Sequence, residues 1–388
     1  MIRVYKYGEG DDNENLEDDF NAWKEGIWGE LTKVAQVVAP EPSAAKNGAQ
    51  TASQNANSLP FVINTGADLK EIDLENYNAS NDEKEYEFQA KQYLASTSAP
   101  ITLIRELRQK THDGSTLHVE IDNKAAGLTY KTAQNLGIYP ENNSSIVQKA
   151  ASLLDLNLKT VFSVEQNPEV VTKGKFKHPI PSPISVETYL SRFCDLQGQL
   201  RKKQLKDLAP FCSNDDNKNK LLFLASNEGK AEFEIQVSSR MKGLLDIIEE
   251  FDVKLSLDQL IQISTLIAPR LYTIASSNKK HPDCVHLCVS ISDDALPDGK
   301  HKVGITSDYL TRKYKESQQG KSFGKARINI RDSTFTLPMD ANVPVIMVGP
   351  GAGVAPFKGF VDEKAHLITG GNKFSFLKMI LISQLYRN

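Results

Sequence analysis

The stretch Val343 to Phe360, VPVIMVGPGAGVAPFKGF, contains an apolar run, a glycine-rich turn and a second apolar segment that begins near a proline. Val345 to Val348 is apolar throughout, as strands of parallel sheets tend to be. Glycines let a backbone approach a phosphate closely, and Pro356 suits the first turn of a helix because it has no N–H to leave unpaired. The stretch predicts a strand, a nucleotide-binding turn and a helix. A purely structural turn is the alternative, because a lone G-x-G pattern is weak evidence.

Composition narrows the class of protein. The chain has 388 residues, of which 40% are hydrophobic and 24% charged, and its formal net charge is -3. This length suffices for two or three domains, and the charge gives no electrostatic footprint for nucleic acid or an anionic membrane. Four scattered cysteines form no disulfide framework, and no apolar run approaches the ~20 residues of a spanning helix. We expect a cytoplasmic protein with small-molecule chemistry, without a signal peptide or transmembrane segment.

The N-terminal part predicts the end of one domain and a linker. Ile2 to Tyr7 alternates as a strand does, and apolar residues recur at helical spacing from Phe20 to Val34. Ala39 to Pro60 is poor in bulky apolar residues and rich in Ala, Asn, Ser and Pro. That composition predicts a flexible connection.

A helical block interrupts a β region in the rest of the chain. Short alternating segments begin near Ala99, helical spacing dominates between Ser144 and Ile267, and strands resume at Arg270. The expected helices lie in SIVQKAASLLDLNL, VETYLSRFCDLQ, KNKLLFLAS, RMKGLLDIIEEF and LDQLIQISTL; the later expected strands lie in RLYTIASS, CVHLCVSI, ARINIRDS and FTLP. The apolar run at Val345 starts a further unit.

Two motifs in the second β region carry anion-binding chemistry. Arg270 and Tyr272 lie two residues apart on a predicted strand, so they share one face. A guanidinium can hold a phosphate while a phenol ring stacks on a planar heterocycle, as a dinucleotide flavin requires. Gly304 precedes a predicted helix start at Ile305 to Ser307, where free N–H groups favour an anion. A surface arginine beside a half-buried tyrosine, and an ordinary helix cap, are the alternatives.

Taken in order, the motifs resemble a known family. They are Arg270-Leu271-Tyr272-Thr273 with Ala275-Ser276-Ser277, then HPDCVHLCVSI, then Gly304-Ile305-Thr306-Ser307, then VPVIMVGPGAGVAPFKGF. Together they resemble the FAD and NADPH modules of the diflavin reductases, and within them the microsomal NADPH–haemoprotein reductases. The opening GEGDDNENLEDDFNAWKEGIW is similar to the end of that family's flavodoxin-like FMN domain.

The resemblance implies a mixed β and α/β fold. Its parts are an antiparallel FAD-binding β-barrel of ferredoxin–NADP reductase type with an inserted helical connecting domain, the first strand–helix unit of a Rossmann-like NADP domain, and a remnant of a flavodoxin-like domain. The implied boundaries are 1–38 for the flavodoxin-like remnant, 39–60 for the linker, 61–140 and 268–340 for the barrel, 141–267 for the connecting domain, and 341–388 for the incomplete NADP-binding domain.

The resemblance also assigns an FAD site. Arg240 and Arg270 would pair with the pyrophosphate, Tyr272 would stack on the isoalloxazine, and Thr273 would act near N5, where hydride arrives. The implied FAD-binding set is Arg240, Arg270, Leu271, Tyr272, Thr273, Cys288, Val289, Ser290, Gly304, Ile305, Thr306 and Ser307.

For NADP the resemblance implies a set of phosphate contacts, and the sequence departs from the family's pattern at two places. The implied set is Arg105, Gly351, Ala352, Gly353 and Pro356. Ala352 stands where the family usually has threonine, which removes a hydroxyl. Thr132 to Asn135, TAQN, replaces a Gly-Asp pair that is common in the family.

The implied function is electron transfer from NADPH through FAD toward FMN and a haem protein. The FMN phosphate loop and most NADPH-domain contacts have no counterpart here, so the resemblance predicts bound FAD, no FMN and slow reduction by NADPH. Asp12 matches a residue close to FMN, with a solvated acidic loop as the alternative. Other readings are an FAD-binding or partner-binding fragment without turnover, and a sister enzyme such as the sulfite reductase flavoprotein. Full-length relatives sit on the cytosolic face of the endoplasmic reticulum through an anchor that we do not find here.

No metal site is predicted from the sequence. Asp11, Asn13 and Asn15 have calcium-loop spacing, but Leu16 and Ala22 occupy the glycine and glutamate positions of such a loop. Cys284 and Cys288 have no second pair nearby, and the seven histidines form no metal-like pair in sequence.

Overall fold

The computed structural model describes residues 59–75, 87–108, 114–170, 176–338, 343, 345–369 and 381–382. All of them belong to one of the two compact units into which the chain divides, Ser58–Asn388. The expected strand at Ile2, the helix ending at Val34, Asp12 and nearly all of the linker lie outside the described residues.

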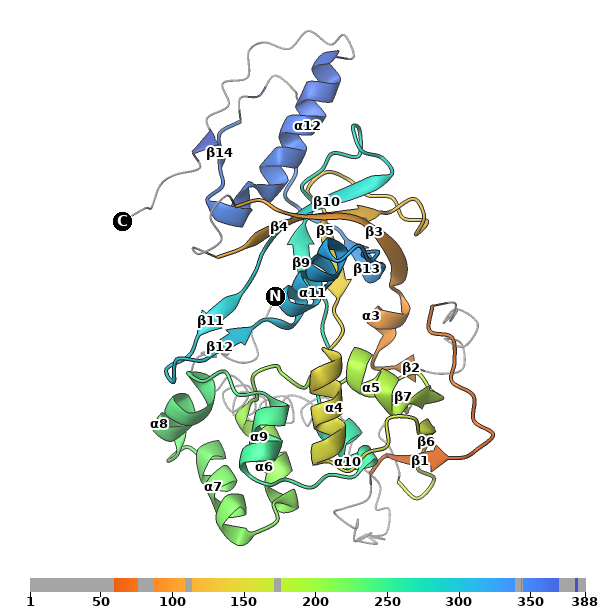
Figure 1. The fold of residues 1–388 in the computed structure, drawn as a ribbon, viewed down its shortest axis with the longest axis vertical. Coiled ribbons are helices and arrows are strands. Elements are labelled where there is room, and N and C mark those ends of the chain that lie inside the picture. The colour runs from red at the N-terminus through yellow and green to blue at the C-terminus, as the bar shows by residue number, and fades with distance from the viewer. Residues whose placement is uncertain are drawn as a thin grey trace, which may run out of the picture. The chain divides into compact units, whose positions relative to one another are not determined.

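A six-stranded antiparallel sheet forms the centre of the described region (Figure 1). Its strand order is β10-β4-β3-β13-β5-β9. The strands are β3 (Thr97–Glu106), β4 (Thr116–Asp122), β5 (Asn135–Tyr139), β9 (Arg270–Thr273), β10 (Cys284–Ser290) and β13 (Lys325–Arg331). Just beyond β9, Ala275 N donates to His286 O at 2.8 Å, so the two edge strands of the sheet meet.

Alternation along these strands builds the core of the sheet. Leu117, Val119 and Ile121 of β4 are at most 1% exposed, and they pack with the apolar residues of β10 and β13. Helix α11 (Ile305–Gln318) adds Tyr309 and Leu310 to the same core, so its first turns are fixed against the sheet. The expected strands in ARINIRDS and CVHLCVSI, and the helix start at Ile305, are confirmed.

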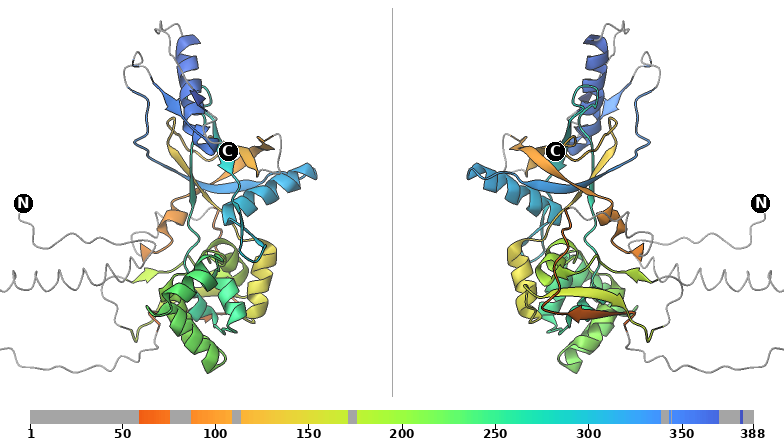
Figure 2. Two further views of the ribbon diagram at one scale, coloured as in Figure 1. Left: turned by 90° about the vertical axis from the view of Figure 1, so that its left-hand side faces the viewer. Right: turned by 90° about the vertical axis from the view of Figure 1, so that its right-hand side faces the viewer.

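A block of helices has a second core of its own (Figure 2). Its helices are α4 (Ser144–Leu153), α5 (Val186–Arg192), α6 (Lys202–Leu208), α7 (Asp215–Ala225), α8 (Lys230–Phe233), α9 (Leu244–Glu250) and α10 (Leu257–Ile263), with the short turns η2 (Ala209–Phe211) and η3 (Glu234–Ser238). All five helical segments expected from periodicity are present. Their apolar faces supply most of the buried residues.

The first described segment joins this block rather than the six-stranded sheet. Strand β1 (Phe61–Thr65) pairs with β6 (Val161–Gln166), which also pairs with β8 (Ile184–Ser185). The short helix α3 (Lys91–Leu94) packs in the same core. The partner of β1 thus lies about a hundred residues later in sequence, and the expected boundaries of the barrel stay a prediction.

Two short strand pairs lie outside the two larger sheets. Strands β2 (Glu87–Phe88) and β7 (Lys177–His178) form a short parallel pair, and β11 (Asp293–Ala295) with β12 (His301–Val303) forms the hairpin that leads into α11. The strand expected at Phe335–Pro338 is not formed, and none of the described strands pairs with this segment.

The quoted C-terminal stretch folds as strand, turn and helix. Strand β14 (Met347–Val348) pairs in parallel with β15 (Leu381–Ile382), and η4 (Gly351–Val354) leads into α12 (Ala355–Thr369). The strand is shorter than expected. Met347 is fully buried, but Ile346 and Val348 are 72% and 53% exposed.

Candidate functional site

Arg270, Tyr272 and Thr306 come together where β9 meets the start of α11. Burial raises the pKa of Tyr272, while the Thr306 hydroxyl and the Arg270 charge act in the opposite direction, which locates both groups beside the phenol. Tyr272 is half-buried and Arg270 is exposed. A ring and a free guanidinium on one strand face, beside a helix N-terminus, form the arrangement expected from the period of a strand.

The first turn of α11 is held in place by the preceding hairpin. Gly304 N donates to Ser292 O at 3.1 Å, and Ser292 N donates to Ser307 Oγ at 2.9 Å. The Ser307 side chain is therefore occupied by the fold. Ile305, Thr306 and Ser307 can offer backbone N–H groups at the positive end of a 14-residue helix, which is the geometry that favours an anion.

These residues fit a phosphate-bearing flavin nucleotide. Thr306 is 3% exposed, and its hydroxyl lies beside the Tyr272 phenol. Arg270 is exposed, and no described carboxylate forms an ion pair with it. An exposed guanidinium and the N–H groups at a helix N-terminus are donors that a pyrophosphate requires.

The other expected flavin residues occupy both faces of β9 and β10. Leu271 is 46% exposed, and Thr273 Oγ1 donates to Asn135 Oδ1 at 3.2 Å, on the strand face opposite Tyr272. Val289 is fully buried in the core of the sheet, while Cys288 and Ser290 lie on the other face of β10. Burial raises the pKa of the Cys288 thiol. Val289 therefore supports the site from within the core.

The turn before α12 contains three glycines, and the space or backbone conformation at each of them differs. A Cβ on Gly349 would lie 2.7 Å from Gly353 O and 2.7 Å from Phe357 Cδ2, so only glycine fits there. Gly351 has a φ of +55°, in the left-handed region that favours glycine. A Cβ on Gly353 would meet only Pro350 Cδ, at 3.8 Å, which leaves its outer side open to a ligand. Gly349 was missed by the sequence analysis, although it stands in the same quoted stretch.

Residues 352 and 356 lie where the pattern predicts. Ala352 is within η4, and Pro356 is the second residue of α12, where a missing N–H is tolerated. The turn thus presents backbone groups at the start of a 15-residue helix. This arrangement fits a second phosphate group.

Replacing Gly349 by Ala should loosen this turn. The added Cβ would overlap backbone, which costs about 1–3 kcal/mol when the surroundings cannot yield. We expect faster amide hydrogen exchange across residues 355–369 in Gly349→Ala. Gly353→Ala is the matched control and should keep the exchange of the unaltered chain. Equal exchange rates in the two variants would contradict this account of the turn.

Comparison with known proteins identifies a family for most of the described region. A family model described as "FAD binding domain" matches residues 89–309, more than half of the chain. The chain belongs to this FAD-binding domain family. The match includes the helical block, β9, β10 and the first turn of α11.

The chain is also similar to NADPH–cytochrome P450 reductases. It is 30% identical to the Musca domestica protein over 372 residues, which is 95% of this chain and 53% of that protein. It is 30% identical to the Homo sapiens protein over 381 residues, 96% of this chain and 53% of that protein. The chain thus spans about half the length of these relatives. Among the described residues, no helix is long and apolar enough to cross a membrane.

Within the FAD-binding domain, Arg240 lies on a different element from Arg270, in the loop between η3 and α9. Arg240 is exposed and follows η3. Its loop ends at Gly243, whose N–H donates to Asp246 Oδ2, and Asp246 also pairs with Lys302 Nζ at 3.2 Å. The loop is therefore tied to β12, which leads into Gly304. No contact between Arg240 and Arg270 is present, so its role stays a prediction.

Helix α12 is attached to the FAD-binding domain by charges that the sequence analysis missed. Lys280 and Lys358 pair with Asp362 at 2.8 and 2.9 Å, and Lys358 also donates to Ala275 O at 3.3 Å. Burial raises the pKa of Asp362, but hydrogen bonds from the two lysines and their charges outweigh burial and lower the pKa overall.

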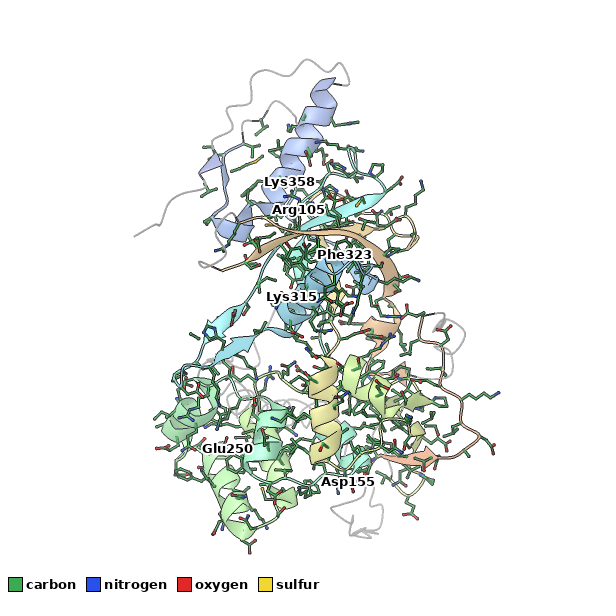
Figure 3. The ribbon with its side chains drawn as sticks, viewed as in Figure 1. Arg105, Asp155, Glu250, Lys315, Phe323 and Lys358 are labelled. Atoms are coloured by element: carbon green, nitrogen blue, oxygen red, sulfur yellow. The ribbon has the colours of Figure 1, made fainter. Side chains whose placement is uncertain are left out.

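Figure 3 shows Lys358 on α12 and Arg105 on β3. Arg105 is exposed, on the strand opposite His118.

The departure at TAQN has a structural cost. Ala133 has a φ of 62° and is fully buried in a small core with Met347 and Phe360. The left-handed conformation costs a residue with a Cβ roughly 1–2 kcal/mol, a cost that glycine would not carry. The Ala133 methyl group compensates in part, since it packs against the strand and helix of the C-terminal unit.

Proposed function

We propose that this chain is the FAD-containing part of an NADPH–haemoprotein reductase, which passes electrons from NADPH through FAD toward FMN and a haem protein. The observation that carries the proposal is the meeting of Arg270, Tyr272 and Thr306 at the N-terminus of α11. The names of the relatives support the acceptor class and the nucleotide. The sulfite reductase flavoprotein is the sister alternative.

The finer architecture is part of the same proposal. The six-stranded sheet with its meeting edges is proposed to be an FAD-binding barrel of ferredoxin–NADP reductase type, and the helical block its connecting domain. The unit containing β14, η4 and α12 is proposed to begin a Rossmann-like NADP domain, because it has a parallel pair followed by a glycine turn and a helix. The residues before the linker are proposed to come from a flavodoxin-like domain.

Each residue then has a defined task. Bound FAD would accept a hydride and release its electrons singly. Arg270 and the N–H groups of Ile305 to Ser307 would hold the pyrophosphate, and Tyr272 would stack against the flavin ring. Thr273, held by Asn135, would lie near the edge where hydride arrives.

Two phosphate sites would then lie at two helix N-termini. Gly351, Ala352 and Gly353 would receive the nicotinamide nucleotide pyrophosphate with backbone groups, and Arg105 would offer a guanidinium from β3. Because Ala352 has no hydroxyl, this turn depends more on its backbone and helix dipole than a threonine-containing turn would. FMN is proposed not to bind this chain.

Replacing Tyr272 by Ala should weaken FAD binding. Loss of the stacking surface removes about 0.5–1.5 kcal/mol beyond burial, or up to about tenfold in affinity, and loss of buried ring area adds to this. Tyr272→Phe keeps the ring and is the matched control. The measurement is a titration of the apoprotein with FAD, in which quenching of the flavin fluorescence reports binding. Equal affinity for FAD in Tyr272→Ala and Tyr272→Phe would show that the ring does not stack on the flavin.

Anaerobic mixing of the FAD-loaded chain with NADPH tests the function. Bleaching of the flavin absorbance, followed by reduction of a haem protein only after an FMN-loaded flavodoxin-like partner domain is added, is the expected result. We expect bleaching to be slow in this chain alone. Flavin that stays oxidised over many minutes with excess NADPH would contradict the reductase proposal and favour the alternative of an FAD-binding fragment without turnover.

A further inference from the structure

Three metal-binding side chains that are distant in sequence meet on the outer face of the six-stranded sheet. Glu120 of β4 lies opposite His286 of β10 in the antiparallel register, and His118 is two residues before Glu120 on the same strand face. The alternate residues of both strands, Leu117, Val119, Ile121, Val285, Leu287 and Val289, fill the core on the other face. From the sequence we predicted no metal-like pair of histidines. His118 and His286 come together only in the fold, because they lie on two paired strands that are distant in sequence.

The distances suit a small coordination sphere. His118 Nε2 lies 2.9 Å from Glu120 Oε1, and His286 Nε2 lies 3.8 Å from the same oxygen. All three candidate ligand atoms lie within 4.8 Å of one another. Ligand atoms of a tetrahedral zinc site are roughly 3.3 Å apart, given metal–ligand bonds of about 2.0–2.1 Å. Rotation of the side chains can bring the three ligand atoms to the spacing of a zinc site.

His286 is a buried imidazole that the fold hardly uses. It is 7% exposed, and its Nδ1 has no hydrogen-bond partner among the described residues. Its Nε2 faces Glu120 at 3.8 Å, which is too far for a hydrogen bond. Burial lowers the pKa of His286 to about 4, although the Glu120 charge opposes this. An imidazole with neither nitrogen in a hydrogen bond among the described residues has a lone pair to offer to a metal ion.

Arg105 of β3 lies opposite His118 in the register, but it is exposed, so its guanidinium can extend into solvent. The other charges near the cluster do not exclude a cation. Lys280 and Lys358 approach from the loop after β9 and from α12, but both are paired with Asp362. His281 packs its ring 4.3 Å from that of His286, and burial lowers its pKa, so it adds little positive charge near neutral pH. Glu120 is the carboxylate that faces the two histidines.

We propose that His118, Glu120 and His286 bind one divalent transition-metal ion, with Zn²⁺ as the best match. Two imidazoles and one carboxylate favour zinc over magnesium or calcium, which take oxygen ligands. Three protein ligands leave a fourth position for water. The site joins β4 to β10 next to the attachment of α12. This inference does not depend on the proposed reductase function.

The test is isothermal titration calorimetry of the native chain with ZnCl₂, after a chelator has removed bound metal. Elemental analysis then gives the metal content of the chain. We expect one Zn²⁺ per chain. Glu120→Gln and His286→Gln should each weaken binding at least about tenfold, since loss of a ligand costs no less than loss of a supporting group. Circular dichroism monitors folding, and if His286→Gln fails to fold, Glu120→Gln decides the outcome.

Two control variants keep the assignment specific. His301→Gln removes an exposed histidine that pairs with Asp293 at 2.9 Å, and should leave zinc binding unchanged. Cys212→Ser removes a half-buried thiol of the helical block, and should also leave zinc binding unchanged. No zinc binding, binding that survives in Glu120→Gln, or binding that is lost in either control would overturn the proposal.

Discussion

Charge reversal at Arg270 is expected to remove FAD from the chain. Arg270 is exposed on β9, lies close enough to Tyr272 to affect its pKa, and forms no ion pair with a described carboxylate. A hydrogen bond to a charged group contributes about 1.5–3 kcal/mol. Arg270→Glu loses such contacts with the pyrophosphate and adds repulsion, so we expect FAD affinity to fall by about 100-fold or more.

The measurement for this variant is retained flavin after gel filtration, followed by titration with FAD. Arg201→Glu is the matched control, because Arg201 is an exposed arginine at the start of α6 within the helical block. It changes the net charge equally and should retain FAD. Arg270→Glu that keeps FAD as tightly as Arg201→Glu would contradict the assignment of Arg270 to the phosphate.

Replacing Arg327 by Ala should have the largest effect on stability. Arg327 of β13 is 9% exposed, and its guanidinium donates to Ser96 Oγ at 2.8 Å and to Leu74 O at 3.0 Å. It also lies 4.5 Å from the centre of the Tyr93 ring. Since Leu74 and Tyr93 pack with the helical block, this arginine ties the block to the six-stranded sheet.

The expected loss is about 3 kcal/mol or more, because several buried acceptors lose their donor at once. Arg327→Lys should recover only part of it, since an ammonium cannot reproduce the guanidinium fork. Arg331→Ala, on the same strand with a single bond to Gln92, is the control and should cost far less. The measurement is the urea midpoint by circular dichroism. Similar midpoints for Arg327→Ala and Arg331→Ala would show that this network contributes little.

Local patterns predicted the parts of the site that depend on one segment. The period of a strand gives the shared face of Arg270 and Tyr272, and glycine followed by a polar turn gives the start of α11 at Ile305. The strand, turn and helix around Gly351 follow for the same reason, because backbone geometry there depends on neighbouring residues.

Features that join distant segments could not be predicted in this way. The pairing of β1 with β6, the approach of His286 to Glu120 and the attachment of Asp362 to Lys280 each depend on tertiary packing. The H-x-E spacing of His118 and Glu120 on a predicted strand was a usable signal for two of the three residues of that cluster. The strand expected at Phe335–Pro338 was wrong because a strand needs a partner, which composition does not reveal.

The most direct test of the account is the flavin content of the purified chain. Denaturation should release the flavin, and chromatography would identify and quantify it. The account predicts one FAD per chain and no FMN, with FAD lost selectively in Arg270→Glu. Stoichiometric FMN, or a colourless chain that does not take up added FAD, would contradict it.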